Sequence, residues 1–271
     1  MANLIGRLPS GLANRVAAPP LVLLYHALAE VPPDHDPHNL VLSPARFRND
    51  LEGLLERGYE FVRLSEFSRR LRRGDRLERV CSLTLDDGTA DNAHVLPGLL
   101  EQLQVPATVF VCPALLGRAY AWTAREAGIR IMTADELRAL ARVPLVDIGS
   151  HTLEHRVLSK ASAEQAFEEM ASSKRSLEEL LGRTVESFAY PECGYSPECP
   201  AAAERAGYTT AVTCGPWGRW DPYELRRENP SRVDGRLLLA LKTRGVFFHV
   251  RRSPPGRLLR AAIRSRRPNS G

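Results

Sequence analysis

The chain has 271 residues, of which 44% are hydrophobic and 25% are charged. This composition supports a substantial buried core and excludes disorder as the default state, and the length fits one large α/β domain. The formal net charge is +5, but much of the arginine excess lies in residues 69–76 and 251–271, and the middle of the chain is nearly balanced. We therefore expect no nucleic-acid partner.

Neither a membrane-spanning nor a secreted protein is predicted. No run of 18 apolar residues occurs, and residues 1–20 lack the continuous apolar segment of a signal peptide. We therefore expect a cytoplasmic protein, with reduced thiols. The cysteines form an odd set with no C-x-x-C pair: Cys81, Cys112, Cys193, Cys199 and Cys214. Cys193 and Cys199 share a predicted loop and could pair if the protein met an oxidant.

Short apolar, β-rich segments alternate along the chain with longer segments of helical period. The predicted strands are residues 21–26, 79–85, 107–112, 146–150, 186–190, 209–213 and 246–250. The predicted helix boundaries are Ser43-Pro44 and Gly58 for one helix, a capping box of Thr133 with Glu136, and a second box of Ser162 with Gln165 in a helix that ends at Gly182.

This alternation predicts parallel strands joined by helical crossovers, in either an open sheet or a closed barrel. The length and the number of repeats favour an α/β fold of the (β/α) barrel type, and no strand is followed by a nucleotide-binding glycine motif. We expect a single domain at residues 20–250, between an N-terminal extension (1–19) and a basic C-terminal tail (251–271).

Four of the predicted strands end in polar or ionisable residues, and in parallel α/β folds the chemistry collects at these carboxyl ends. The residues are Tyr25-His26 after the first strand, Asp86-Asp87-Gly88 after the second, His151 and His155 after the fourth, and Tyr190-Pro191-Glu192 after the fifth. All four groups are expected at the same rim.

Asp86 and Asp87 are adjacent like charges, which an enclosed site tolerates only with a cation or a shared proton. The four-residue spacing of His151 and His155 places both imidazoles on one side of a turn. With one carboxylate they would form a three-ligand site for Zn²⁺ or another divalent metal. Each motif alone also occurs in ordinary turns, but their joint placement at strand ends favours the metal site.

The segments SLTLDDG, GSHTLEH and SFAYPECG resemble the leading motifs of the polysaccharide deacetylase family, the NodB-like carbohydrate esterases of family 4. The resemblance extends through the connecting segments from about residue 20 to about residue 235. LLYHALAE is similar to the first strand of a branch that includes poly-N-acetylglucosamine deacetylases. The resemblance implies a distorted (β/α) barrel of about seven strands. It also implies hydrolysis of the N-acetyl group of N-acetylglucosamine units, or of a related acyl group, with a divalent metal, usually zinc, with cobalt or nickel as alternatives.

The resemblance also implies roles for individual residues. Asp87, His151 and His155 would bind the metal, and Asp86 would be the general base. A late L-L-H-D motif, which supplies the general acid in many relatives, does not occur here. His26 would take that role, unless it only hydrogen-bonds the rim of the barrel; His249 is a weaker rival.

Three further residues would act on the substrate or the oxyanion by the same resemblance. Arg227 fits the family segment that brings an arginine towards the catalytic aspartate better than Arg232 does, although a solvated arginine is an alternative. A backbone N–H of the AYPECG motif, which contains Tyr190, would stabilise the oxyanion. Glu192 stands where the family usually has tyrosine, which puts substrate preference and activity in question; a fourth metal ligand is the rival interpretation.

Other segments leave alternatives open. Trp122, Trp217 and Trp220 could stack on sugar rings or pack the interior. The DHDPH segment (34–38) contains two histidines and two aspartates that could bind a metal, but its proline-rich surroundings favour a loop. Residues 256–267 could form a basic amphipathic helix that contacts an anionic membrane, whereas a solvated terminus is the alternative.

The substrate also remains open at this level. Without an export signal, a sugar nucleotide, a lipid-linked saccharide or a biosynthetic intermediate is expected, and the acyl group could be formyl. A second class of function is a non-catalytic member that binds glycans or assembles into a complex. The sequence makes no prediction of the oligomeric state.

Overall fold

The computed structural model describes residues 18–214, 220–232 and 234. The predicted strand at 246–250, His249, Trp217 and the C-terminal tail lie outside the described residues, as does most of the N-terminal extension. Within the described part of the chain, no helix is both long enough and apolar enough to cross a membrane.

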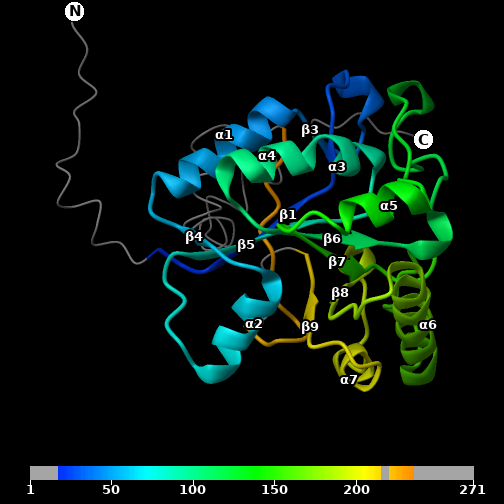
Figure 1. Cartoon of the computed structure of the whole chain (residues 1–271). Helices are drawn as coiled ribbons and strands as arrows, with labels where there is room; N and C mark the ends of the chain where they lie inside the picture. The colour runs from blue at the N-terminus through cyan, green and yellow to red at the C-terminus, as the bar shows by residue number, and fades with distance from the viewer. Residues whose placement is uncertain (1–17, 215–219, 233, 235–271) are drawn as a thin grey trace, which may run out of the picture.

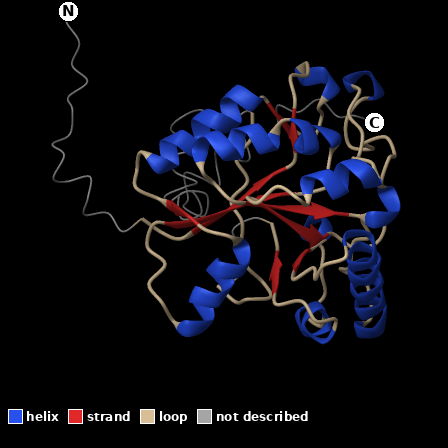
Figure 2. Cartoon of the chain, in the orientation of Figure 1, coloured by secondary structure: helices blue, strands red, loops and turns tan. Residues whose placement is uncertain are grey.

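The centre of the protein is a curled parallel sheet of seven strands (Figures 1 and 2). Its order is β1 (Leu21–Tyr25), β5 (Val80–Leu85), β6 (Ala107–Val111), β7 (Val146–Ser150), β8 (Ser187–Ala189) and β9 (Thr210–Val212), with β4 (Glu60–Phe61) beside the start of β5. The six predicted strands that fall on described residues are thereby confirmed. Every residue of β1, β5 and β6 is buried, as expected for parallel strands covered on both faces.

The segment Leu225 to Glu228 closes the ring between the two ends of this sheet. Leu225 donates its N–H to the Ala211 carbonyl at β9 (3.0 Å). Glu228 donates its N–H to the Val22 carbonyl and accepts from the Leu24 N–H, both in β1 (2.8 and 2.9 Å). The predicted barrel is therefore present, with its last position occupied by a short irregular segment.

Helices cover the outside of the sheet (Figure 2). They are α1 (Pro44–Leu55), α2 (Leu64–Arg73), α3 (Ala90–His94), α4 (Leu96–Leu103), α5 (Ala134–Leu140), α6 (Ala163–Leu181) and α7 (Cys199–Arg205). A short pair of strands, β2 (Ala27–Leu28) and β3 (Val41–Leu42), lies beyond the end of β1.

The helix ends follow from local hydrogen bonding. Thr133 and Ser162 each form the predicted capping box, and Gly182 ends α6 in the left-handed conformation. The hydroxyl of Ser43 caps α1, which ends at Leu55, three residues before the predicted glycine.

The barrel interior combines apolar and charged groups. Val22, Phe110 and Val212 belong to one buried cluster formed with residues of α2 and the segment before β5. The guanidinium of Arg227 lies over the ring of Phe110, 5.7 Å from its centroid, and Arg227 is completely buried. The closing segment thus carries a positive charge into the barrel, next to the end of β5.

Candidate functional site

The turn after β5 separates the two adjacent aspartates. The N–H of Asp86 donates to the Tyr25 carbonyl (2.9 Å), which extends the pairing of β5 with β1. Asp87 and Gly88 both have positive φ (69° and 66°). A Cβ at Gly88 would lie 2.9 Å from Cγ2 of Val111, so this position needs glycine for both conformation and space. The chain turns sharply here, and the two buried carboxylates face different neighbours.

Asp87 meets both predicted histidines. Its Oδ1 lies 3.5 Å from Nε2 of His151 and 3.4 Å from Nε2 of His155. The three residues each offer a ligand atom within 4.8 Å of the others, in the part of the chain that the structure describes. The segment between His151 and His155 is a loop and not a helical turn, because Thr152 and His155 both have positive φ (63° and 61°). This loop brings the two imidazoles together.

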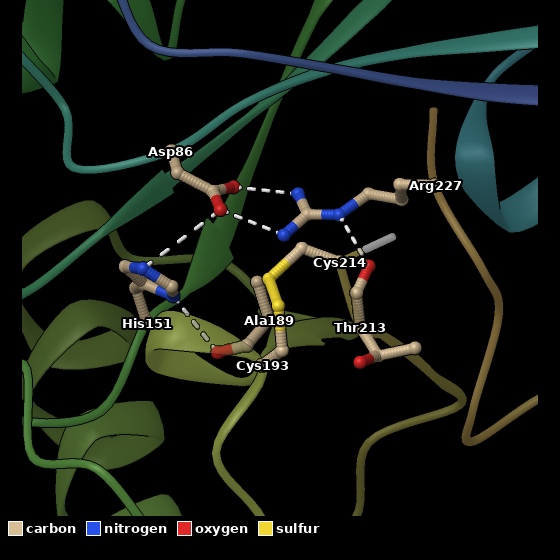
Figure 3. Close-up of a disulfide and its surroundings, with 7 residues drawn as sticks. All are labelled: Asp86, His151, Ala189, Cys193, Thr213, Cys214 and Arg227. Carbon is tan, nitrogen blue, oxygen red and sulfur yellow. Dashed lines mark hydrogen bonds and ion pairs between the residues drawn. A yellow bond between two sulfur atoms is a disulfide. The ribbon is translucent and has the colours of Figure 1, made fainter. Parts of the chain in front are cut away.

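His151 is held in the tautomer that a metal ligand requires. Its Nδ1 lies 2.8 Å from the Ala189 carbonyl, which can only accept, so Nδ1 carries the proton and Nε2 presents its lone pair (Figure 3). Burial lowers the pKa of His151, and the opposing effect of Asp86 does not compensate. A neutral imidazole is therefore favoured.

One carboxylate oxygen of Asp87 is buried without a hydrogen-bond partner among the described residues. Oδ1 is buried and makes no hydrogen bond to any described residue, whereas Oδ2 accepts from the Tyr120 hydroxyl (2.6 Å). Burial raises the pKa of Asp87, but its interactions with His155, His26 and His151 outweigh this, and the net pKa lies below the usual range. An ionised, unpaired oxygen between two imidazole nitrogens fits a divalent cation, because leaving it unpaired is costly.

Asp86 has a different environment. Arg227 donates from Nη1 to Oδ1 (2.6 Å) and from Nη2 to Oδ2 (2.7 Å), in a bidentate pair (Figure 3). Burial raises the pKa of Asp86, but Arg227 and His151 more than offset this effect and lower the pKa. Its Oδ2 also lies 3.9 Å from Nε2 of His151, so Asp86 borders the three-residue group without belonging to it.

Arg227 is itself fixed by two further acceptors. Its Nε donates to the Thr213 carbonyl (2.8 Å) and its Nη1 to Oγ1 of Thr84 (3.1 Å). The rival Arg232 lies elsewhere and pairs with Asp36 (3.2 Å). The structure therefore places Arg227 at Asp86, and the alternative of a solvated arginine is wrong.

A disulfide joins Cys193 to Cys214, with 5.0 Å between the Cα atoms (Figure 3). The expectation of reduced thiols throughout is therefore wrong, and so is the alternative pairing of Cys193 with Cys199. Cys199 begins α7 and is buried as a free thiol. Cys193 and Cys214 follow the adjacent strands β8 and β9, so the sheet brings them together across 21 residues of sequence.

The two predicted site residues of the AYPECG turn, Tyr190 and Glu192, lie in different environments. Tyr190 is buried, donates its hydroxyl to the Tyr223 carbonyl (3.0 Å) and its N–H to the Val212 carbonyl (3.0 Å), so both donors are used within the core. Glu192 is exposed, at φ 52°. It is not part of the Asp87 group, so the interpretation as a fourth metal ligand is not supported.

His26 lies at the same rim, between β1 and β2, and is half-buried. It is close enough to lower the pKa of both Asp86 and Asp87. A small pocket next to it is lined by Asn39, Asn229 and Arg232, among other residues.

The DHDPH segment has a structural role. Asp36 is buried and accepts from the N–H groups of Leu40 and Val41 (2.9 and 3.1 Å), and so shapes the loop before β3. This confirms the loop assignment for the segment.

The two described tryptophans differ. The ring centroids of Trp122 and His155 lie 4.3 Å apart. Trp220 instead packs against Phe67, with ring centroids 5.6 Å apart, and the Arg226 guanidinium lies 4.6 Å from the centroid of the Trp220 ring. Only Trp122 of this described pair belongs to the site.

The polysaccharide deacetylase family profile matches residues 73–211, slightly more than half of the chain. The chain belongs to this family. The matched range contains both aspartates and both histidines of the site. A curated relative, YxkH of Bacillus subtilis (strain 168), is 26% identical over 196 residues, which cover 72% of this chain. The chain spans 64% of the length of that relative.

Solved structures of deacetylases have the same fold. The Streptococcus pyogenes deacetylase PplD, in complex with acetate, superposes with a TM-score of 0.69 at 24% identity, covering 82% of this chain and 97% of that one. IcaB from Ammonifex degensii superposes with a TM-score of 0.70 at 19% identity, covering 83% and 97%. The barrel predicted from the sequence is thereby confirmed as the fold of the family.

Sequence reasoning missed three contributors to the site. Tyr120 lies in a loop with no motif, and its only signal was an aromatic pair with Trp122, two residues later. The pairing of Cys193 with Cys214 depends on strand order. The Ala189 carbonyl, which orients His151, is a backbone group and leaves no trace in sequence.

Proposed function

We propose that this protein hydrolyses the N-acetyl group of an amino sugar, in an N-acetylglucosamine-type glycan or conjugate, and releases acetate and a free amine. The carrying observation is the unpaired Oδ1 of Asp87, which lies between the Nε2 atoms of His151 and His155 and beside the separate carboxylate of Asp86. Deacetylation requires both a cation site and a base, and this rim offers both. We place the catalytic domain within residues 20–250.

The group would hold its metal through Asp87, His151 and His155, and the mixed nitrogen and oxygen donors fit zinc first, with cobalt or nickel as substitutes. A divalent ion bound there would lower the pKa of water towards ~7 and polarise the acyl oxygen. The ring of His151 is already oriented for this purpose by the Ala189 carbonyl.

Asp86 would accept the proton of the attacking water. Arg227 keeps this carboxylate ionised and fixes its plane, and each carboxylate oxygen retains a second lone pair for the water. A lowered pKa makes Asp86 a weak base. It therefore suits a water that has itself been made more acidic.

His26, which follows the carboxyl end of β1 at the same rim, would donate a proton to the leaving amine. Its half-buried position beside both aspartates supports this role. A backbone N–H of the AYPECG turn would contribute to oxyanion stabilisation, and the disulfide at Cys193 would hold this turn in place. Because the Glu192 side chain is exposed, it would border the entrance and influence which sugar is accepted.

The disulfide also bears on where the protein acts. Disulfides persist in oxidising compartments and are rare in the cytosol. We therefore propose action outside the reducing cytoplasm, in place of the cytoplasmic location expected from the sequence, on a polymer or lipid-linked amino sugar.

The test measures acetate and formate release from N-acetylated and N-formylated glucosamine oligomers. The chain is stripped with a chelator and reloaded with Zn²⁺, Co²⁺ or Ni²⁺. Acetate release should appear only after reloading, and Asp86→Asn should lower it about 10²- to 10⁴-fold. Asp147→Asn, which alters a half-exposed aspartate paired with Arg63, is the matched control and should keep full activity. A metal-loaded wild type without turnover on any of these sugars would favour the non-catalytic glycan-binding function.

A further inference from the structure

A hairpin-like loop stands directly against the metal-site turn. Its two arms meet at Ala119 and Arg130, and Tyr120 donates its N–H to the Ile129 carbonyl (3.1 Å). The loop is described throughout residues 113–132. It lies between β6 and α5, outside the motifs that carry the expected ligands.

The loop is hydrogen-bonded to the residues that follow Asp87. The Met132 N–H donates to the Gly88 carbonyl (3.0 Å), and the Ala90 N–H donates to the Arg130 carbonyl (2.9 Å). These two hydrogen bonds make Thr89 and Ile131 an antiparallel bridge pair. The position of the loop is therefore coupled to the position of Asp87 through two backbone hydrogen bonds.

This attachment brings two aromatic side chains onto two of the three candidate ligands. The Tyr120 hydroxyl donates to Oδ2 of Asp87 at 2.6 Å, and both residues are 4% exposed. The Trp122 ring lies 4.3 Å from the ring of His155, tilted by 56°. The Tyr120 and Trp122 rings also contact each other, with centroids 5.2 Å apart.

We propose that Tyr120 is a positioning residue for the metal site: its hydroxyl fixes the carboxylate of Asp87 so that Oδ1 faces the two histidines, while Trp122 fixes the ring of His155. This inference rests on the metal dependence proposed above. A carboxylate can bind a cation through one oxygen or both, and it rotates freely unless an outer partner holds it. Occupying Oδ2 leaves Oδ1 as the oxygen available to the cation.

Packing alone does not explain a tyrosine at this position. A buried phenol needs an acceptor. Tyr208 and Tyr190 donate to the backbone carbonyls of Met170 (2.9 Å) and Tyr223, and Tyr25 makes only a long contact with Oδ2 of Asp50 (3.5 Å). Tyr120 instead donates to an ionised side chain, in a charge-assisted bond. Its effect is therefore expected on metal binding more than on folding.

The experiment measures the Zn²⁺ dissociation constant of the full chain by competition with a chromophoric chelator. Tyr120→Phe should weaken Zn²⁺ binding about 10- to 100-fold, as removal of an outer partner of a ligand typically does. Tyr208→Phe is the matched control: it also removes one buried hydroxyl, but one that donates to the Met170 carbonyl and not to a candidate ligand, and it should leave the dissociation constant unchanged. Circular dichroism checks that both variants are folded.

Trp122→Phe is a second variant with an independent expectation. It removes part of the aromatic contact with His155 and should weaken Zn²⁺ binding about two- to tenfold. The absorption bands of the Co²⁺-loaded chain should also change in Tyr120→Phe and not in Tyr208→Phe, because only the first variant frees a ligand to rotate.

The outcomes separate the inference from the function on which it rests. Equal Zn²⁺ affinity in wild type and Tyr120→Phe, or an equal loss in Tyr208→Phe, would overturn the role of Tyr120. A wild-type chain that binds no divalent metal would overturn the proposed function and this inference with it. Tight metal binding without turnover, with a loss in Tyr120→Phe, would reject the activity and support the positioning role.

Discussion

Asp86 and Asp87 are neighbours in sequence, but their carboxylates have different partners. Asp86 has both oxygens paired with the buried guanidinium of Arg227. Asp87 has one oxygen paired with the Tyr120 hydroxyl, and its other oxygen faces two imidazoles without a hydrogen bond. Two adjacent carboxylates are tolerated because each has its own positive or hydrogen-bonding partners, and only one of them still needs a cation.

The surroundings of Asp86 (the Asp86 side) and those of Asp87 (the Asp87 side) also come from different parts of the chain. The Asp86 side depends on the closing segment of the barrel and on β9, more than 120 residues later in sequence. The Asp87 side is built by loops that follow β6 and β7, the next strands of the sheet. Substitutions around Asp86 should therefore affect folding and the proposed general base. Substitutions around Asp87 should affect binding of the cation.

Exchange of each aspartate should give the largest effects and separates the two roles. Asp87→Asn should lose the divalent ion, and with it all turnover, because a neutral amide replaces the anionic ligand. Asp86→Asn should retain the ion while losing most of its activity. Elemental analysis after dialysis, combined with acetate release, measures both. Loss of the ion in both variants to the same extent would contradict the division of roles.

Arg227→Met should destabilise the fold by about 3–5 kcal/mol, because it leaves the buried Asp86 without its counter-charge. The matched control is Arg138→Met, which breaks an exposed pair with Asp135 and should cost about 0–1 kcal/mol. Urea unfolding followed by circular dichroism gives both free energies. Similar values for the two variants would mean that Asp86 is not dependent on Arg227.

The disulfide on the Asp86 side predicts a thiol count as well as a stability change. The unfolded, unreduced chain should react at three thiols, Cys81, Cys112 and Cys199, and at five after reduction. Reduction should lower the free energy of unfolding by about 2–4 kcal/mol. The Cys193→Ser, Cys214→Ser double variant is the control, since reductant should not change its stability. Five reactive thiols before reduction would exclude the disulfide.

The smallest effect concerns acid stability on the Asp87 side. Glu136 accepts hydrogen bonds from Arg130, in the loop that carries Tyr120, and the Arg130 guanidinium is the main cause that holds the pKa of Glu136 well below its ordinary value of 4.5. The unfolded chain therefore binds more protons at acid pH. The stabilisation is complete above pH 4.5 and is lost as the pH falls through the lowered pKa.

Glu136→Gln should accordingly flatten the acid limb of the stability curve, measured as urea midpoints between about pH 5 and pH 2. Asp135→Asn changes a neighbouring, 93% exposed carboxylate and serves as the control, with little expected change. An acid limb that is equally steep in wild type and Glu136→Gln would show that this ion pair does not couple to folding.

Several features of the fold and site could be predicted because they depend on local sequence. Capping boxes at Thr133 and Ser162 involve residues three apart, and strands β1, β5 and β6 are continuous apolar segments. The metal group was predictable because its ligands lie in the short segments after β5 and β7, and parallel strands end at a common rim. The Tyr190 N–H belongs to the turn that was expected to supply a backbone donor, but it is paired with the Val212 carbonyl, because β8 and β9 are neighbours in the sheet.

The sequence by itself determined the barrel, the rim and the identity of the groups that gather there, because strand periodicity and strand-end residues are properties of short segments. The tertiary structure decided that Arg227 is paired with Asp86 and not solvated, which cysteine pairs with Cys193, and that Tyr120 reaches Asp87. These contacts join residues 21 to 141 positions apart. They are set by which strands are neighbours and by how loops dock on the rim, and no local pattern encodes either.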